Sequence, residues 1–543
     1  MTADFTITGQ QRIAGQVSAD GDDGQPTFRS VNPRTREADP VAFHNATLAE
    51  IDRAVAAAQA AYAETRHYPA SRLARFMEGV AGVIDDLGEG LLATADRETA
   101  LGIPRLTSER GRTTGQLRQF AALLREGSYV QAILDSALPD RQPAPRPSIR
   151  RMLFPIGPVA VFAASNFPLA FSVAGGDTAS AFAAGCPVIV KAHPGHPATS
   201  ELTAQAVEWA VREMGFPPGF FSLVQGNRTE VGQALVKHPG IAAVGFTGSL
   251  RAGRAIYNAA ASRPTPIPVY AEMGSVNPVV VLPGAIASRS ASLAEGLVAS
   301  VTLGSGQYCT NPGLIFVIDG DGTPEFVDAL VAQMSSRAPG VLLNETVQRG
   351  LVRTVEATLG KPGIERLMGG GPIDGAGYCF AHTVLQTTAS AFRADPELQN
   401  EHFGPVTLIV RCESRDDLLA ALEALHGSLT ATIHTGDSDV VGDIEQSFVA
   451  RVADLLREKV GRLIWNGLPT GIEVVYAMQH GGPYPATTAP ATTSVGMTAI
   501  QRFMRPVAFQ GLPDALLPDA LKDGNPLGIW RIVDNQWTRA PIA

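Results

Sequence analysis

Apolar runs of strand length alternate with helical stretches between residues 157 and 272, and this alternation constrains the fold more than any other feature. Apolar residues recur at three- and four-residue spacing in the stretches between the runs. The runs are GPVAVFAA, PVIVKA, FSLVQG, IAAVGFTG and IPVYAEMG. A strand–helix–strand order repeated in this way predicts a parallel sheet covered by helices on both faces, which binds ligands at the carboxyl ends of its strands.

The rest of the chain extends this α/β pattern. Helical spacing also covers much of 48–135, and a second mixed region covers 278–440. The proline-rich segment 138–150 is expected to be an exposed excursion or a connecting strand. Helices between the apolar runs are expected over 169–185, 199–215 (with Thr199 or Ser200 as its cap), 229–237 and 251–261. At 543 residues the chain is too long for one core, so we expect two or three domains.

Composition excludes several classes of function. The net charge of −9 and the lack of a Lys/Arg run argue against a nucleic-acid surface. Four cysteines without CxxC spacing give neither a disulfide framework nor a zinc site. The N-terminus does not have the pattern of a signal peptide, and no apolar run is long enough to span a membrane. We therefore expect a cytoplasmic protein.

Cys309 lies in an unusual place for a cysteine. Its stretch, GSGQYCTNPG, is rich in glycine and short polar residues, so the backbone is expected to turn tightly there. The other three cysteines lie in apolar stretches and are expected to be buried and inert. The spacing of His193 and His196 could suggest a metal pair, but no carboxylate or cysteine cluster accompanies them, so no metal site is expected.

Several motifs follow one another in a characteristic order. They are ASNFP (164–168), KAHP (191–194), FTGS (246–249), AEMG (271–274), GSGQYC (304–309) and EHFGP (401–405). In this order, from about residue 30 to about 510, the chain resembles the aldehyde dehydrogenase superfamily. The resemblance implies an α/β fold with a Rossmann-type cofactor domain (1–137 and 156–272) and an α/β catalytic domain (273–490). It also implies a β oligomerisation segment (138–155 and 491–543) and a homodimer or homotetramer.

The resemblance assigns three catalytic roles. Cys309 matches the nucleophile that forms a thioester with the aldehyde carbon. Asn166 matches the amide that stabilises the oxyanion together with the Cys309 backbone N–H. Glu272 matches the general base for the hydrolytic water, a role that suits a desolvated carboxylate with a raised pKa.

The resemblance also implies a nicotinamide cofactor. The residues expected to bind it are Lys191, His193, Arg228, Gly248, Ser249, Gly253, Gly274, Glu401 and Phe403. We expect NADP because Pro194 stands where NAD-preferring members often carry a glutamate, which would repel a 2′-phosphate. Lys191, His193 and Arg228 would leave cationic groups near that phosphate.

A narrower resemblance points to the substrate. The stretches ERGRTTGQLRQFA (109–121) and QHGGPYPATTAP (479–490) resemble the NADP-using branch of α-ketoglutarate semialdehyde dehydrogenases. This branch implies 2,5-dioxopentanoate as the aldehyde, with Phe167, Arg112 and His480 lining its tunnel. On a helix, Ser108, Arg112 and Gln116 would share one face, and the cation would pair with a substrate carboxylate. Alternatively, Arg112 pairs with Glu109 or another acid.

Other functions stay open at this point. A broad-specificity NADP-dependent enzyme for medium-chain aldehydes or other semialdehydes would share most of these motifs. A CoA-acylating dehydrogenase or a cysteine esterase would form the same thioester with another acceptor, although Glu272 as water activator weighs against the former. A non-catalytic structural protein is disfavoured because Cys309, Glu272 and Asn166 are all present.

Overall fold

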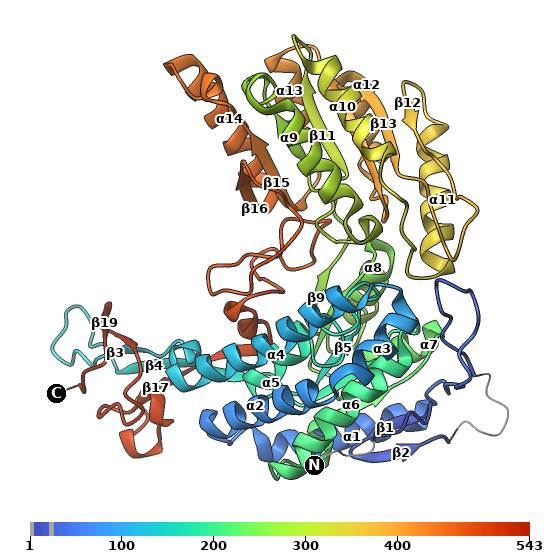
Figure 1. Ribbon diagram of the computed structural model, residues 1–543. Helices are drawn as coiled ribbons and strands as arrows, with labels where there is room; N and C mark the ends of the chain where they lie inside the picture. Colours follow the sequence, from blue (N-terminus) through green and yellow to red (C-terminus); the bar gives the residue numbers. More distant parts are fainter. Residues whose placement is uncertain (1–4, 21–26, 543) are drawn as a thin grey trace.

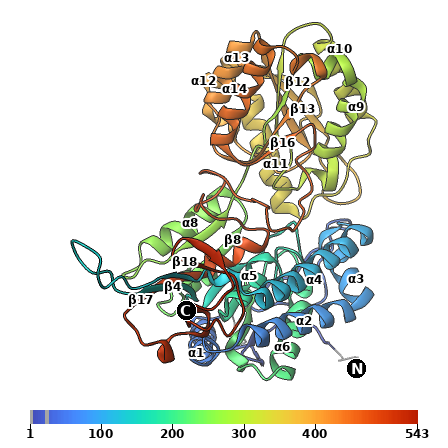
Figure 2. The same ribbon diagram turned by 90° about the vertical axis from the view of Figure 1, so that its left-hand side faces the viewer.

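Three β-sheets organise the computed structural model, which describes residues 5–20 and 27–542 (Figure 1). The first sheet lies in the lower body of the molecule and the second in the upper body. The third projects sideways from the lower body, and Figure 2 shows the same separation from the side. This arrangement confirms the predicted α/β class.

The first sheet contains the alternating segment, with strand order β2-β1-β7-β6-β5-β8-β9. Its strands are β1 (Gln11–Ile13), β2 (Gln16–Ser18), β5 (Val159–Phe162), β6 (Val188–Lys191), β7 (Phe221–Val224), β8 (Ala243–Thr247) and β9 (Val269–Glu272). The strands from β7 to β9 are parallel, as predicted, and the β1–β2 hairpin adds an antiparallel edge. From β5 the chain adds β6 and β7 on one side, and it then returns to add β8 and β9 on the other side of β5. A ligand crevice is expected at the carboxyl ends of β5 and β8, where the order of the strands switches.

Helices cover both faces of this sheet because its side chains alternate. Val161 and Val190 pack into the core cluster that also contains Phe76, whereas the neighbouring Ala160 and Ile189 pack into a second cluster on the other side. The first face is covered by α2 (Ala70–Asp86), α3 (Gly88–Thr99), α4 (Ile103–Glu126), α5 (Gly176–Ala184) and α6 (Pro197–Glu213). The second is covered by α1 (Leu48–Thr65), α7 (Thr229–Lys237) and α8 (Leu250–Ala261).

The second sheet has the order β12-β13-β14-β11-β10-β15-β16 and is parallel except for β12. Its strands are β10 (Val279–Val281), β11 (Leu314–Ile318), β12 (Glu365–Met368), β13 (Thr383–Thr388), β14 (Val406–Cys412), β15 (Ser428–His434) and β16 (Val460–Trp465). Its α-helices are α9 (Pro283–Thr302), α10 (Thr323–Ser335), α11 (Glu345–Leu359), α12 (Ala389–Ala394), α13 (Arg415–Glu423) and α14 (Asp443–Lys459). Core clusters on its two faces contain residues of α9 and α10 on one side and of α12 to α14 on the other.

The third sheet joins segments that lie far apart in the sequence. Its order is β17-β4-β3-β18-β19, built from β3 (Ile133–Asp135), β4 (Ile149–Pro155), β17 (Met504–Gln510), β18 (Arg531–Val533) and β19 (Gln536–Thr538). The proline-rich residues between β3 and β4 are mostly exposed, as predicted for an excursion. In the described part of the chain, no helix has the length and apolarity needed to cross a membrane.

Two predicted helix starts are wrong. The helix expected from residue 169 begins at Gly176, because the carboxylate of Glu109 accepts hydrogen bonds from the N–H groups of Leu169 and Ala170 and holds them in turns. The helix expected from Thr199 begins at Pro197 instead. The buried carboxylate of Glu98, on α3, accepts the free N–H groups at that helix start in place of a local cap.

Candidate active site

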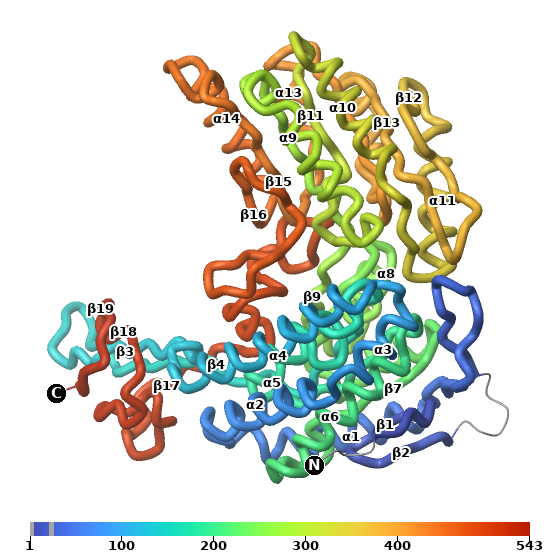
Figure 3. Tube along the Cα trace, viewed as in Figure 1, coloured from blue at the N-terminus to red at the C-terminus, as the bar shows by residue number. Residues whose placement is uncertain are grey.

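The predicted catalytic residues meet between the first two sheets. Glu272 is the last residue of β9, and Cys309 lies just before β11 of the second sheet. Figure 3 shows the segment that follows β16 running back from the upper body to the lower one. There the N–H of Met273 donates to Ala486 at 2.7 Å, and Glu272 forms a β-bridge with Thr487. This returning segment carries His480 and Ser494 to the site.

The Cys309 loop depends on its glycines and on one asparagine. Gly306 has a φ of +69°, and a Cβ there would lie 2.1 Å from the carbonyl oxygen of Gly404. Only glycine therefore lets the loop approach the EHFGP motif so closely. Asn277 fixes the other side, because its Nδ2 donates to the carbonyl of Cys309 at 2.8 Å and to that of Asn311 at 2.9 Å.

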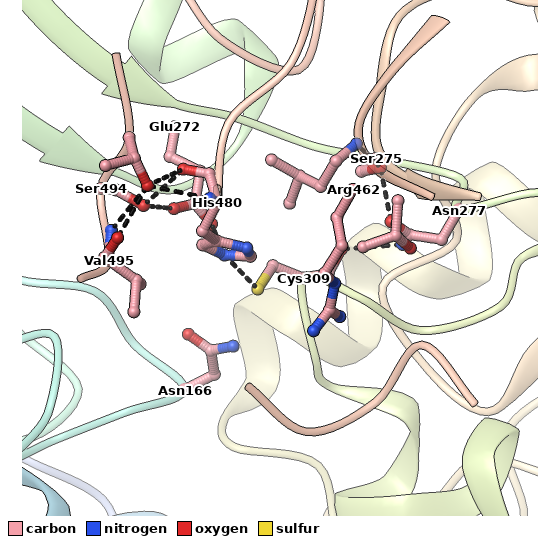
Figure 4. Close-up of polar contacts among 12 residues, drawn as sticks. Asn166, Glu272, Ser275, Asn277, Cys309, Arg462, His480, Ser494 and Val495 are labelled. Carbon is pink, nitrogen blue, oxygen red and sulfur yellow. Dashed lines mark hydrogen bonds and ion pairs between the residues drawn. The ribbon is translucent and has the colours of Figure 1, made fainter. Parts of the chain in front are cut away.

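A chain of polar contacts links Cys309 to Glu272 (Figure 4). The sulfur of Cys309 lies 3.5 Å from Nε2 of His480, and the same nitrogen lies 2.9 Å from Oε1 of Glu272. The hydroxyl of Ser494 donates to the other oxygen of Glu272. The thiol, imidazole and carboxylate atoms all lie within 4.8 Å of one another.

Asn166 lies on the other side of the sulfur from His480 (Figure 4). Its side-chain Nδ2 donates to the carbonyl of Gln307 at 3.0 Å, which ties it to the Cys309 loop. Arg105 donates to the backbone carbonyl of Asn166 at 2.6 Å and so holds this turn in place.

The pKa of Glu272 corrects one prediction. Burial raises it, but the charge and hydrogen bond of His480 and the hydroxyl of Ser494 outweigh burial, so the net pKa lies below its usual value. The predicted raised pKa is therefore wrong in direction. For Cys309, burial and the neighbouring carboxylate of Glu272 raise the pKa of the thiol well above its usual value, while Arg112 opposes them.

Aromatic rings and two arginines form a wall beside Cys309. The guanidinium carbon of Arg112 lies 5.6 Å from the ring centre of Phe167 and 5.2 Å from that of Phe171. Arg105 stacks in the same way, 4.9 Å from Phe167 and 4.7 Å from Tyr308. These contacts place Phe167 and Arg112 together, as predicted.

Arg112 makes no hydrogen bond or ion pair in the described part of the chain, and its Nε is buried without an acceptor. The charge of Glu109 still acts on it, because that carboxylate opposes the lowering of the Arg112 pKa by burial. The Nε2 of Gln116 is likewise buried without an acceptor. Ser108 is exposed, so the predicted three-residue polar face is reduced to these two residues.

Several residues of the site differ from prediction. His480, which was expected to line the tunnel, lies between Cys309 and Glu272 and contacts both. Ser494, Arg105 and Arg462 were missed. Arg105 precedes Arg112 by seven residues on α4, a spacing that puts both on one helix face and could have revealed it. Arg462, a cation within the strand GRLIW, carried a weaker signal; its guanidinium donates to the loop carbonyls of Pro469 and Gly471 near Cys309.

A cavity of about 260 Å³ opens at the carboxyl ends of β5, β6 and β8. Lys191, His193 and Arg228 line it, as predicted, together with apolar side chains such as Phe246 and Ile256. Burial lowers the pKa of Lys191 to about 8 and that of His193 well below its usual value, so His193 offers neutral ring nitrogens and no charge. A flat ring with apolar faces and a nearby anionic group fits this lining.

His196 does not pair with His193 around a metal. The two rings stack with centroids 5.3 Å apart. The Nδ1 of His196 is 3.2 Å from the Ser200 hydroxyl and its Nε2 is 2.8 Å from the Ala164 carbonyl, so both nitrogens have partners within the fold.

A larger cavity of about 710 Å³ continues past the start of α8. Ser249, Gly274 and Glu401 line it, and burial raises the pKa of Glu401 to about 7. A Cβ on Gly274 would lie 2.5 Å from Oε2 of Glu401, so glycine keeps this passage open. At two other predicted residues an added Cβ would meet a neighbouring side chain at 2.7 Å, the ring of Phe246 at Gly248 and Met273 at Gly253. Phe403 is half-buried and is not among the residues that line this cavity.

Comparisons with known proteins found a matching family, similar sequences and similar folds. A sequence model of the aldehyde dehydrogenase family matches residues 20–459. The chain is 46% identical over 535 residues to alpha-ketoglutaric semialdehyde dehydrogenase 2 of Azospirillum brasilense, covering 98% of the chain and 99% of that relative. It is 44% identical over 532 residues to the alpha-ketoglutaric semialdehyde dehydrogenase of Acinetobacter baylyi, with 98% and 99% coverage. In fold it is similar to 1-pyrroline-5-carboxylate dehydrogenase from Thermus with bound NAD, with a TM-score of 0.76, 23% identity and 93% of each chain covered.

Proposed function

The chain belongs to the aldehyde dehydrogenase family, and we propose that it oxidises 2,5-dioxopentanoate (α-ketoglutarate semialdehyde) to 2-oxoglutarate with NADP⁺. One observation carries the proposal: Cys309 is in contact with His480, which also holds Glu272, and the cation of Arg112 stands nearby without a hydrogen bond or ion pair in the described chain. Similarity to two alpha-ketoglutaric semialdehyde dehydrogenases over nearly the whole chain supports the substrate.

The proposed reaction has two halves. The Cys309 thiolate attacks the aldehyde carbon, and the Asn166 amide with the Cys309 N–H stabilises the resulting oxyanion. The bound nicotinamide supplies the hydride acceptor. Collapse of the adduct leaves a thioester on Cys309. Glu272 then takes a proton from the attacking water, and the carboxylate product leaves while the thiolate is restored.

The proposed substrate carries its negative charge at the end opposite to the aldehyde. Arg112 and Gln116 provide buried donors without acceptors, and such groups are costly unless a ligand pairs with them. A carboxylate beside the aromatic wall would satisfy the guanidinium by a charge-assisted hydrogen bond. A broad-specificity enzyme is the second candidate, because the rings of Phe167, Phe171 and Tyr308 would also accept an apolar aldehyde.

Substrate preference tests the role of Arg112. We expect kcat/KM for 2,5-dioxopentanoate to exceed that for hexanal by at least about tenfold, roughly 1.4 kcal/mol of transition-state preference. Arg112→Leu should erode this preference and spare hexanal, because only the acid uses the cation. The measurement is kcat/KM for 2,5-dioxopentanoate, succinate semialdehyde and hexanal in each variant.

Arg118→Leu is the matched control, since Arg118 lies on the same helix but is exposed and pairs with Asp85. It should leave the order of substrates unchanged. A wild-type enzyme that prefers hexanal would contradict the proposed substrate and favour the broad-specificity candidate.

The proposed cofactor is NADP. Lys191 and Arg228 line the cavity, and Pro194 follows Lys191 by three positions in the sequence. A carboxylate at the position of Pro194 would repel a 2′-phosphate. Because His193 is neutral there, the attraction rests on Arg228 and Lys191.

We expect kcat/KM to favour NADP⁺ over NAD⁺ by at least about tenfold. Arg228→Ala should remove most of this preference by weakening NADP⁺ use alone, because NAD⁺ carries no 2′-phosphate. Lys237→Ala removes a positive charge from the exposed far end of the same helix and serves as the control. A clear wild-type preference for NAD⁺ would refute the assignment.

We also propose that the third sheet and the tail form an oligomerisation segment, and that the first two sheets belong to the cofactor and catalytic domains. The third sheet stands away from the body (Figures 1 and 2) and carries the exposed indoles of Trp530 and Trp537. Exposed aromatic side chains of this kind favour contact with another copy of the chain.

A further inference from the structure

His480 is held rigidly although it comes from a long loop. Its backbone N–H donates to the Thr493 hydroxyl and its carbonyl accepts from the N–H of Ser494, both at 2.8 Å. Only 1% of the residue is exposed. The ring is therefore held between Cys309 and Glu272, where it contacts both side chains.

One nitrogen of His480 serves two acidic groups. Its Nε2 lies 3.5 Å from the Cys309 sulfur and 2.9 Å from the Glu272 carboxylate. A nitrogen with a free lone pair would face the electron pairs of the carboxylate, whereas an N–H can donate to both neighbours. The other ring nitrogen, Nδ1, is buried and has no partner in the described chain, so a proton there would be left without an acceptor. In its neutral form the ring therefore carries its proton on Nε2.

The groups around the Cys309 sulfur differ in whether they favour or oppose ionisation of its thiol. Glu272 opposes ionisation of the thiol by its charge and by a hydrogen bond with the thiol, Glu401 opposes it by its charge, and Arg112 favours it. Tyr308 and Arg462 also face the thiol electrostatically, from its own loop and from β16. Hydrogen bonding to a thiolate favours the charged form. His480 is the group placed to give such a bond.

Resting on the proposed function, we infer that His480 is a positioning residue whose Nε2–H is shared by the Cys309 sulfur and the Glu272 carboxylate, so that a thiolate and a carboxylate can stand side by side. The thiol proton is released to solvent before the aldehyde binds, and the ring keeps its own proton. The ring is thus a donor and not the base that receives the thiol proton.

Two substitutions separate a donor from a base. Phenylalanine fills the space of the ring without donating. Glutamine can donate through its amide but cannot take up a proton. A donor role therefore predicts that His480→Gln works where His480→Phe fails.

Alkylation of Cys309 by iodoacetamide measures the thiolate directly and needs neither aldehyde nor cofactor. The rate is followed across pH by mass spectrometry of the Cys309 peptide. We expect the midpoint in His480→Phe to rise by about one pH unit, which is about tenfold slower alkylation below the midpoint. His480→Gln should recover most of the wild-type profile. Ser494→Ala removes the hydroxyl bonds to Glu272 and to the His480 carbonyl, keeps the backbone N–H bond to that carbonyl and changes no bond to Cys309, so it should leave the midpoint nearly unchanged.

Two results would overturn the inference. One is an unchanged midpoint in His480→Phe, and the other is a His480→Gln profile that matches His480→Phe. NADP⁺ binding to each variant, followed by fluorescence, checks that the fold is intact. Failure of the proposed substrate or cofactor would leave the alkylation result untouched, so the two proposals fail separately.

Discussion

A Cys309→Ala variant is expected to lose aldehyde oxidation by a factor on the order of 10⁴ or more. Among the described cysteines, Cys309 is the one whose sulfur contacts His480, and without the proposed thioester neither half of the reaction proceeds. The fold should survive, because the loop is held by Gly306 and by the bonds from Asn277 to backbone carbonyls. Steady-state reduction of NADP⁺ with 2,5-dioxopentanoate measures the loss, and cofactor binding checks the fold.

Cys412→Ala is the matched control. Cys412 is fully buried at the end of β14, and burial raises the pKa of its thiol to about 12. Its loss should cost about 1 kcal/mol of stability from the small cavity and little activity. Substantial turnover in Cys309→Ala would contradict the thioester mechanism.

Helix bounds were predicted correctly where residues of the helix itself and its flanks determine them. Helix α7 was expected over 229–237 and has those bounds, since its apolar spacing and polar flanks are both local. The starts of α5 and α6 were misplaced because their free N–H groups bond to Glu109 and Glu98, which come from other helices. No signal near residues 169 or 199 reports a carboxylate that lies 60 or more positions away.

In the candidate site, too, local motifs could be recognised in the sequence but contacts between distant residues could not. Cys309, Glu272 and Asn166 were expected from motifs, and the structure brings them together. His480 lies 171 positions from Cys309 and 208 positions from Glu272 in the sequence. Its place between them could therefore not be predicted from spacing. The lowered pKa of Glu272 follows from that contact and from Ser494, which explains why an argument from burial alone gave the wrong direction.

A Glu272→Gln variant is expected to give one burst of reduced cofactor and then stall. The amide keeps the size of the side chain but cannot take a proton from water, so the thioester forms and is not hydrolysed. The steady-state rate should fall by about 10²–10⁴-fold, the usual worth of a general base. Rapid-mixing measurement of NADPH absorbance gives the burst and the steady rate in one trace.

The pH profile of the wild-type steady state follows from the direction of the same pKa. A lowered pKa keeps the Glu272 carboxylate ionised down to pH values at which an ordinary glutamate takes up a proton, so hydrolysis should persist as pH falls from 7 towards 5. Loss of the base is expected only below the usual pKa of a glutamate, about 4.3. A raised pKa would instead give an acid limb between pH 6 and 7.

The size of the burst decides which half of the reaction Glu272 serves. A burst close to one NADPH per active site, followed by the slow phase, places Glu272 in hydrolysis alone. A burst that shrinks with the steady rate would mean that Glu272 also helps to form the thiolate, because acylation would then be impaired as well. A normal steady rate would remove Glu272 from the reaction. Alkylation of Cys309 in this variant provides the control, since removing the carboxylate charge that opposes the thiolate should speed it.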